Sequence, residues 1–165
     1  VSDEFTVTVP PFSLLAVELL HRDSVSAPVN LAPFAAATAS SYSTIGPHFR
    51  PASAVDGKMY TRWNSAAWTK SNGEEEQWYQ LEWPAVRTVG SVTIQWGESP
   101  ARDFLIKGSA DGSSWQTLSA MTGNAEAVSR FAFAPREIRL LRIEATRGAK
   151  GISAYSIREL EVYAE

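Results

Sequence analysis

The sequence predicts an all-β protein, an antiparallel β-sandwich of about eight strands. Apolar and polar residues alternate along most of the chain, which is the period of a half-buried strand. Turn signals such as Asp111-Gly112 separate these runs. No segment of helical length has the spacing of an amphipathic helix, and only residues 51–55, which begin with a proline, indicate a single helical turn. Short strands joined by turns are typical of a sandwich or a barrel.

Eight runs of residues are expected to form the strands. In residues 77–83, for example, Tyr79, Leu81 and Trp83 fall on one face and polar residues on the other. The runs are residues 4–9, 13–20, 77–83, 92–96, 103–109, 129–134, 138–145 and 157–163. Beyond the first example, the residues expected on the buried faces are Val92, Ile94, Trp96, Phe104, Ile106, Phe131, Phe133, Leu141, Ile143, Ala145, Leu160 and Val162.

Composition narrows the class of protein. The 165 residues are 44% apolar and include six Trp, seven Phe and five Tyr, enough to bury a full core without disulfides. The net charge of −3 is too small to predict a nucleic-acid or anionic-membrane partner. There is no cysteine, which favours a cysteine-poor exported protein such as a bacterial one. No apolar run approaches the ~20 residues of a membrane-spanning helix. The first residues carry no signal peptide and begin on strand-like sequence, so we expect the chain to be part of a longer protein.

The stretch AVDGKMYTRW, residues 54–63, places Asp56 and Thr61 where both can offer oxygen atoms. Calcium takes six to eight oxygens from carboxylates, hydroxyls and backbone carbonyls. One carboxylate carries too little charge for tight binding, and Glu159 or Glu161 near the end of the chain could add a second. The alternative is that Asp56 only caps a turn and Glu159 is solvated.

Residues 30–163 resemble a discoidin domain, the C-type domain of coagulation factors V and VIII. They are most similar to family 32 carbohydrate-binding modules of bacterial glycoside hydrolases. The resemblance rests on six motifs in order: NLAPFAAATASSYS, PASAVDGKMYTRW, QWYQLEW, VGSVTIQW, RDFLIKGSADGSSWQTL and YSIRELEVY. It implies a galactose-binding-domain-like jelly roll.

The resemblance also implies a structural calcium that ties an early loop to the last strand. Trp63 would then belong to the core below this loop. The implied ligands are the side chains of Asp56, Thr61 and Glu159, with backbone carbonyls from Ser53, Lys58, Thr61 and Arg158.

The first 27 residues resemble the last strands of the β-domain attached to many (β/α)8-barrel glycoside hydrolases. We therefore expect two parts, residues 1–27 from an upstream β-domain with a linker and residues 28–165 as the carbohydrate-binding module. This implies the tail of a secreted modular hydrolase, with the upstream catalytic domain as a partner.

Sugars are bound by an aromatic ring against their apolar face and by fixed polar groups at their hydroxyls. Trp68 lies in a loop of small and polar residues and is either an exposed platform or a loop anchor. Related modules bind galactose with a His, an Arg, an Asn and an aromatic residue. The candidates are Tyr42, His48, Asn64, Trp68, Arg102, Arg147 and Tyr155, with Arg50 beside them. Four other tryptophans are expected to be structural: Trp78, Trp83, Trp96 and Trp115.

Three functions are weighed. The first is a non-catalytic module that tethers a hydrolase to polysaccharide or another glycan. The second is a discoidin-type adhesion module for membrane lipid or a protein, although the glutamates near Trp68 disfavour an anionic surface. The third is catalysis, which needs two positioned carboxylates. Glu98, Asp103 and Glu144 are present but form no recognisable pair, so we expect the chain itself to be no enzyme.

Overall fold

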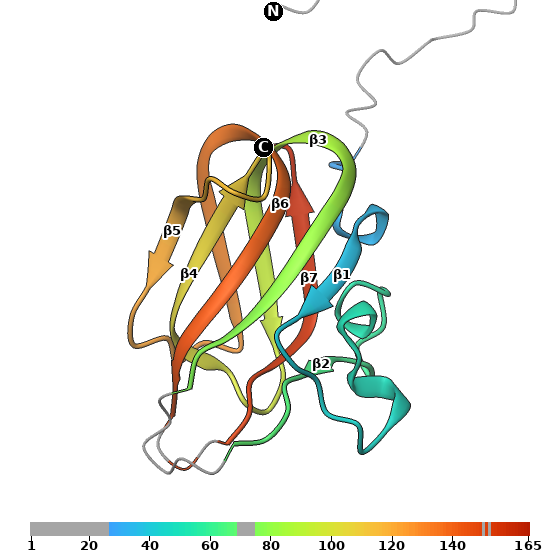
Figure 1. Ribbon diagram of the computed structural model, residues 1–165, viewed down its shortest axis with the longest axis vertical. Helices are drawn as coiled ribbons and strands as arrows, with labels where there is room; N and C mark the ends of the chain where they lie inside the picture. The colour runs from blue at the N-terminus through green and yellow to red at the C-terminus, as the bar shows by residue number, and fades with distance from the viewer. Residues whose placement is uncertain (1–26, 69–74, 150, 152) are drawn as a thin grey trace, which may run out of the picture.

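The structure is a computed structural model, and it describes residues 27–68, 75–149, 151 and 153–165. The regular structure of the described chain is β-strand, apart from three single turns of 3-10 helix (Figure 1). The strands expected at residues 4–9 and 13–20 lie outside the described residues, as does nearly all of the expected upstream segment 1–27. None of the described helices has the length and apolar character that a membrane span requires.

The elements follow one another in a fixed order along the chain. They are η1 (Ala32–Phe34), β1 (Ala36–Ala39), η2 (Pro47–Phe49), η3 (Pro51–Ala54), β2 (Trp63–Asn64), β3 (Gln77–Trp96), β4 (Ala101–Ser109), β5 (Gln116–Met121), β6 (Val128–Gly148) and β7 (Ser156–Tyr163). The sheet has seven strands in the order β2-β7-β3-β6-β4-β5, and β1 pairs with β3. All these pairings are antiparallel.

Two long strands, β3 and β6, pass over one end of the molecule and belong to both layers of the sandwich (Figure 1). They pair with each other from Gln77↔Ala145 at one end to Gln95↔Val128 at the other, with register shifts between Glu82 and Arg87 and between Val89 and Ser91. The sequence predicted two separate strands for each. The structure differs because the shifts let the paired ribbon bend while its ladder continues.

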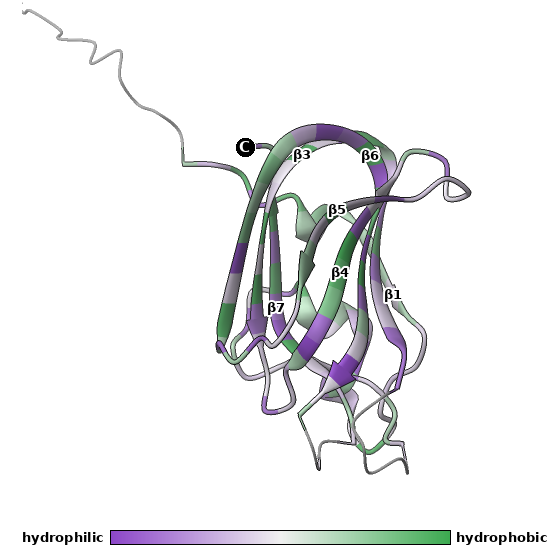
Figure 2. Ribbon diagram, turned by 90° about the vertical axis from the view of Figure 1, so that its left-hand side faces the viewer, coloured by the Kyte–Doolittle hydropathy of each residue, from purple (hydrophilic) through white to green (hydrophobic). Residues whose placement is uncertain are grey.

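The two layers enclose the core that the alternation predicted. Tyr79, Leu81 and Trp83 on β3 are all fully buried, as expected. Bands of hydrophilic and hydrophobic residues alternate along β3 and β4 (Figure 2). Phe131 and Phe133 are only partly buried and pack against the edge of the core. The prediction for these two phenylalanines was therefore too strong.

The sequence analysis missed β1, β2 and β5. These strands are short and carry few large apolar residues, and β5 has the burial pattern of an edge strand with much of its length exposed. Their pairing with longer neighbours defines them, since a two-residue strand such as β2 has no periodicity of its own.

Several loops meet at the end of the sandwich opposite the two arches (Figure 1). Backbone hydrogen bonds hold them together: the Ser43 N–H donates to the Asn64 carbonyl at 2.8 Å, and the Trp68 N–H donates to the Ser153 carbonyl at 2.9 Å. The Ser156 N–H donates to the Ser99 carbonyl at 2.8 Å. This loop end is the part of the fold that can present a binding site on a rigid support.

Candidate functional site

The loop that carries Asp56 is closed by its own side chains. Oδ1 of Asp56 accepts hydrogen bonds from the Lys58 N–H at 3.0 Å and from the Thr61 hydroxyl at 2.8 Å. The Thr61 hydroxyl also lies 2.9 Å from the Lys58 carbonyl oxygen. Gly57 has a φ of 73°, which a residue without a side chain adopts at no steric cost. The loop therefore curls its oxygens toward one region.

Glu159 on β7 reaches this loop from the far end of the chain. Its side chain is buried, with 4% exposure, and Oε1 accepts a hydrogen bond from the Gly57 N–H at 3.2 Å. Oε2 is also buried and has no hydrogen-bond partner. Burial raises the pKa of Glu159 to about 7; the Gly57 hydrogen bond opposes the rise and the nearby Asp56 carboxylate adds to it. Two acidic groups thus converge as the charge argument required.

A buried carboxylate oxygen without a donor is costly, and a cation is the natural partner for such an oxygen next to a second carboxylate. The residues present therefore fit a calcium ion. No cluster of three or more His, Asp or Glu side chains exists in the described ranges, so backbone carbonyls must supply the remaining oxygens. The expected carbonyl ligands at Ser53, Lys58, Thr61 and Arg158 lie on this loop or beside Glu159 on β7 and stay predictions.

Trp63 lies in the core beneath this loop. It is 1% exposed, and its indole N–H donates to the Ser41 carbonyl at 2.9 Å. Its ring lies 5.4 Å from that of Tyr79. The Tyr79 hydroxyl in turn donates to the Pro51 carbonyl at 2.9 Å. Burial raises the pKa of Tyr79. The segment that carries Asp56 is thus anchored to the core through two aromatic side chains, Trp63 and Tyr79.

At the loop end, Trp68 packs against Tyr155, with ring centroids 4.8 Å apart and planes inclined by 51°. Trp68 is partly buried against the core, and its indole nitrogen is buried without a hydrogen-bond partner. Trp68 is therefore anchored in its loop, and a ligand can reach only the part of the ring that Tyr155 leaves open.

Tyr155 is fully buried. Its hydroxyl donates to the Glu75 carbonyl at 2.8 Å and its backbone N–H donates to the Ser65 hydroxyl at 3.0 Å. Burial raises the pKa of Tyr155 to about 12. The expectation that Tyr155 contacts a sugar is corrected accordingly: its ring has no free surface, because it supports Trp68 from below.

Arg147 pairs with Asp103 through two contacts, Nε to Oδ2 at 2.5 Å and Nη2 to Oδ1 at 3.0 Å. The Gly123 N–H adds a hydrogen bond to Oδ1 at 2.8 Å. Together these donors, Arg147 first, hold the pKa of Asp103 below its usual value. Arg102 on β4 is partly exposed, and its carbonyl accepts the Asn124 N–H at 2.8 Å.

Of the other predicted sugar ligands, Tyr42 and His48 lie between β1 and η3, and Asn64 lies on β2. Tyr42 is 44% exposed and shares two adjoining hollows of about 350 and 380 Å³ with Arg50. His48 is exposed, and its carbonyl accepts the Arg62 N–H at 3.1 Å. Asn64 uses its carbonyl to hold Ser43. The seven predicted residues thus have separate partners and do not form one cluster of side chains in the described structure.

Comparison with known proteins identifies the family. The model for the F5/8 type C domain matches residues 36–160. The chain belongs to the F5/8 type C domain family.

Solved structures of the same fold support this assignment. The domain is 30% identical to chitosan-binding module 1 of a chitosanase/glucanase from Paenibacillus sp. IK-5, with a TM-score of 0.72 over 82% of this chain and 98% of that one. Chitosan-binding module 2 of that enzyme, in complex with chitotriose, is 29% identical, with a TM-score of 0.70 over 81% and 99% of the two chains. The family 32 module of Clostridium perfringens NanJ, in complex with galactose, is 24% identical with a TM-score of 0.67 over 81% and 97%. No curated protein matches the chain significantly.

The F5/8 type C domain also carries a charged cluster that the sequence analysis missed. Glu98, in the loop between β3 and β4, accepts Nη1 of Arg62 at 3.0 Å and lies 3.4 Å from Nη2 of Arg158. Nη1 of Arg158 donates to the Met59 carbonyl at 2.9 Å. The sequence held no signal for it, because Glu98 is 36 and 60 residues from its partners. The cluster links Met59 and Arg62, in the segment that carries Asp56, to the β3–β4 loop and to β7.

Proposed function

We propose that this F5/8 type C domain is a non-catalytic carbohydrate-binding module that holds a secreted glycoside hydrolase on polysaccharide. One observation carries the proposal. The loop end of a fold shared with chitosan-binding modules presents an anchored tryptophan, Trp68, on a buried Tyr155. The ligand class is an oligosaccharide or polysaccharide.

Binding follows from pre-positioned groups. A pyranose ring lays its apolar face on the open part of Trp68, which Tyr155 holds in place, so little side-chain entropy is lost. The Arg147 guanidinium is oriented by Asp103 and would donate to sugar hydroxyls. One or two such contacts give a Kd of about 10 μM to 1 mM.

A structural calcium belongs to this proposal. Asp56, Thr61 and Glu159 would hold it, with the carbonyls of Ser53, Lys58 and Arg158. When bound, the ion neutralises two carboxylates and joins the start of the module to its last strand. Because it binds only the folded state, it stabilises the fold by mass action.

The biological role would be to keep a catalytic domain close to its polysaccharide substrate. A weakly bound module raises the local concentration of substrate around a tethered catalytic domain. This role implies an upstream catalytic domain in the same protein and secretion to the polysaccharide. No pair of carboxylates in the described residues is assigned to catalysis, since Asp103 pairs with Arg147 and Glu98 with two arginines.

Affinity electrophoresis in gels that contain chitosan, a galactose-containing polysaccharide or a plant polysaccharide tests the proposal. Wild-type mobility should fall with one or more of these, and Trp68→Ala should abolish the effect while the variant remains folded, as its circular dichroism spectrum will show. Phe34→Ala removes another exposed aromatic ring, 63% exposed, and should keep the retardation. Equal retardation of the wild type and Trp68→Ala would contradict the proposed site.

A second candidate, a discoidin-type adhesion module for membrane lipid or a protein, is supported by apolar residues at the surface. Ile45 is 92% exposed and Tyr60 is 74% exposed. Co-sedimentation with phosphatidylserine vesicles tests it. Co-sedimentation that Ile45→Ser removes would favour adhesion. No co-sedimentation with vesicles, together with retardation by polysaccharide, would favour the carbohydrate function.

A further inference from the structure

Two tryptophans and an arginine stack on the outer face of the layer formed by β1, β4, β5 and parts of β3 and β6. The Arg142 guanidinium, on β6, lies 4.8 Å from the ring centre of Trp78 on β3 and 4.2 Å from that of Trp115 beside β5. All three side chains are partly exposed. The sequence predicted only structural roles for both tryptophans. The solvent-facing side of an antiparallel sheet is normally polar. Two tryptophans on this face are therefore a feature that structure alone does not require.

Each member of this Trp78–Arg142–Trp115 stack is held in place. The Trp115 indole N–H donates to the Gly112 carbonyl at 3.2 Å. The turn below it is fixed by Asp111, whose Oδ1 accepts two backbone N–H groups at 2.8 Å each. Nε and Nη2 of Arg142 both donate to Gln80 Oε1, at 3.0 and 2.7 Å. A rigid surface of this kind loses little entropy when it binds a ligand.

Two hydrogen-bond donors of the stack have no acceptor within the described residues. Within the described residues, the Trp78 indole N–H and Nη1 of Arg142 make no hydrogen bond, and neither atom is buried. Both point to a ligand that supplies acceptor oxygens.

The charges around the stack favour an acidic ligand. Lys107 pairs with Glu144, and Arg139 pairs with Glu82. Arg142 has no carboxylate partner in the described part of the chain; its bonds go to the neutral Gln80 amide. A positive charge therefore remains at the centre of this face.

We propose that this sheet face is a second glycan-binding site and that it takes a chain containing uronic acids. The parts of the two indoles that Arg142 leaves open receive the apolar faces of the sugars. Nη1 of Arg142 donates to a uronate carboxylate, a charge-assisted hydrogen bond. The core of a protein interface is depleted of charged residues, whereas Lys107, Glu144, Arg139 and Glu82 surround this stack. The large apolar side chains that are most exposed lie elsewhere: Val29, Phe34, Tyr42, Ile45, Met59, Tyr60 and Val86.

The stack and the loop end are built from different side chains. Arg142 stacks on Trp78 and Trp115, whereas Trp68 packs against Tyr155. A variant at Trp68 therefore separates the two sites. Failure of the loop-end proposal leaves this one standing, and the converse also holds.

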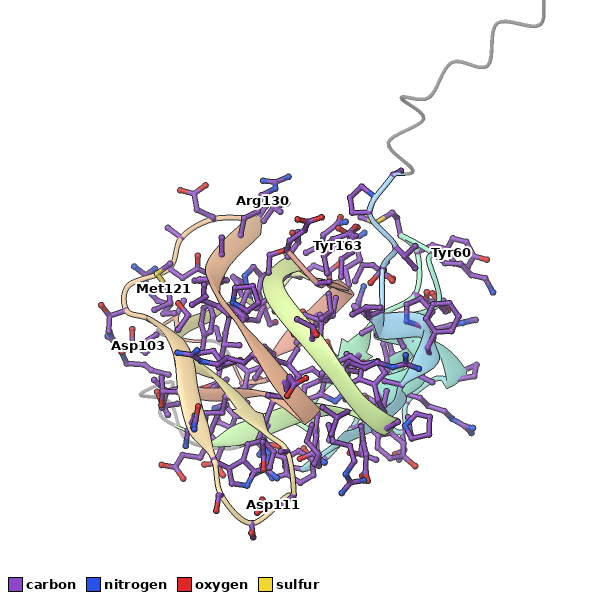
Figure 3. The ribbon with its side chains drawn as sticks, turned by 90° about the horizontal axis from the view of Figure 1, so that it is seen from above. Tyr60, Asp103, Asp111, Met121, Arg130 and Tyr163 are labelled. Atoms are coloured by element: carbon purple, nitrogen blue, oxygen red, sulfur yellow. The ribbon has the colours of Figure 1, made fainter. Side chains whose placement is uncertain are left out.

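Affinity electrophoresis in polygalacturonate, and in the same polymer fully methyl-esterified, tests the proposal. The wild type and Trp68→Ala should be retarded by the acid form only. Arg142→Gln and Trp78→Ala should each lower the association constant at least tenfold, whereas Arg130→Gln should not change it. Arg130 is a matched control because it is exposed and lies on the side of the molecule opposite Asp111 (Figure 3). Absence of wild-type retardation, or equal retardation by the esterified polymer, would overturn the proposal.

A nuclear magnetic resonance titration with oligogalacturonate locates the contact without relying on a destabilised variant. The indole N–H signal of Trp78, assigned through Trp78→Phe, should move on addition of the oligosaccharide, and that of Trp68 should stay. Movement of the Trp68 signal alone would assign the acidic glycan to the loop end and overturn the sheet-face site. Self-association of the wild-type domain that is absent from Trp115→Ala would also overturn it, because the face would then be an interface between two copies.

Discussion

The carboxylate of Glu159 accepts a hydrogen bond from the Gly57 N–H at 3.2 Å, across 102 residues of sequence. This contact ties β7 to the loop after η3 and places a buried acid beside Asp56. The second oxygen of Glu159 is buried and unpaired, so the ionisation of this carboxylate is coupled to the stability of the fold and to any cation bound there.

The first prediction concerns pH without calcium. The pKa of Glu159 is about 7 in the folded state, against an ordinary value of 4.5, so the folded state binds the proton more tightly than the unfolded state. Stability must then fall as pH rises from about 5 to 8, by on the order of 2 kcal/mol. Urea unfolding in a chelator at the two pH values measures it. Glu159→Gln should remove this part of the dependence, and an unchanged slope in that variant would contradict the assignment.

The second prediction concerns calcium itself. At a concentration 100 times its Kd, calcium should stabilise the wild type by about 2.7 kcal/mol, with a larger effect at pH 8 than at pH 5 because the ligands must be deprotonated. Asp56→Ala should abolish the stabilisation. Glu137→Gln, a charge change in the arch of β6, should retain it. A calcium response in Asp56→Ala equal to the wild-type response would show that the ion binds elsewhere.

The third prediction concerns Trp63, which is 1% exposed and lies in the core beneath the loop that carries Asp56. Trp63→Ala should cost about 3–5 kcal/mol, because it leaves a cavity and removes the donor to the Ser41 carbonyl. Val86→Ala, at a position 48% exposed, should cost less than about 0.5 kcal/mol. Urea denaturation measures both, and similar values for the two variants would contradict the core role of Trp63.

The fourth prediction concerns the support beneath Trp68. Tyr155→Phe removes the hydroxyl that donates to the Glu75 carbonyl at 2.8 Å and keeps the ring under Trp68. We expect a loss of about 1 kcal/mol in stability and a few-fold loss of polysaccharide retardation, because the Trp68 loop is held less firmly. Tyr163→Phe, whose hydroxyl donates to Glu161 at 3.2 Å, serves as the control with unchanged retardation. A Tyr155→Phe variant that binds as the wild type does would show that Trp68 needs no such support.

Side-chain alternation was enough to predict the class of fold and most of the core. Tyr79, Leu81 and Trp83 are buried as their spacing indicated, because a strand with one buried face must alternate. The motif order pointed to the family that the domain match over residues 36–160 confirms. The arches of β3 and β6 were not predictable, since the shift near Glu82 that bends the ribbon is a property of two paired strands.

What the sequence alone determined about this protein is local: which face of the core strands is buried, and that Asp56 and Thr61 share one loop. The tertiary structure decided which distant groups meet. It brought Glu159 to Gly57, buried Tyr155 under Trp68 and stacked Arg142 on Trp78 and Trp115. The physical reason is that burial and charge act between groups in space, and residues as many as 102 positions apart become neighbours only when the sheet closes.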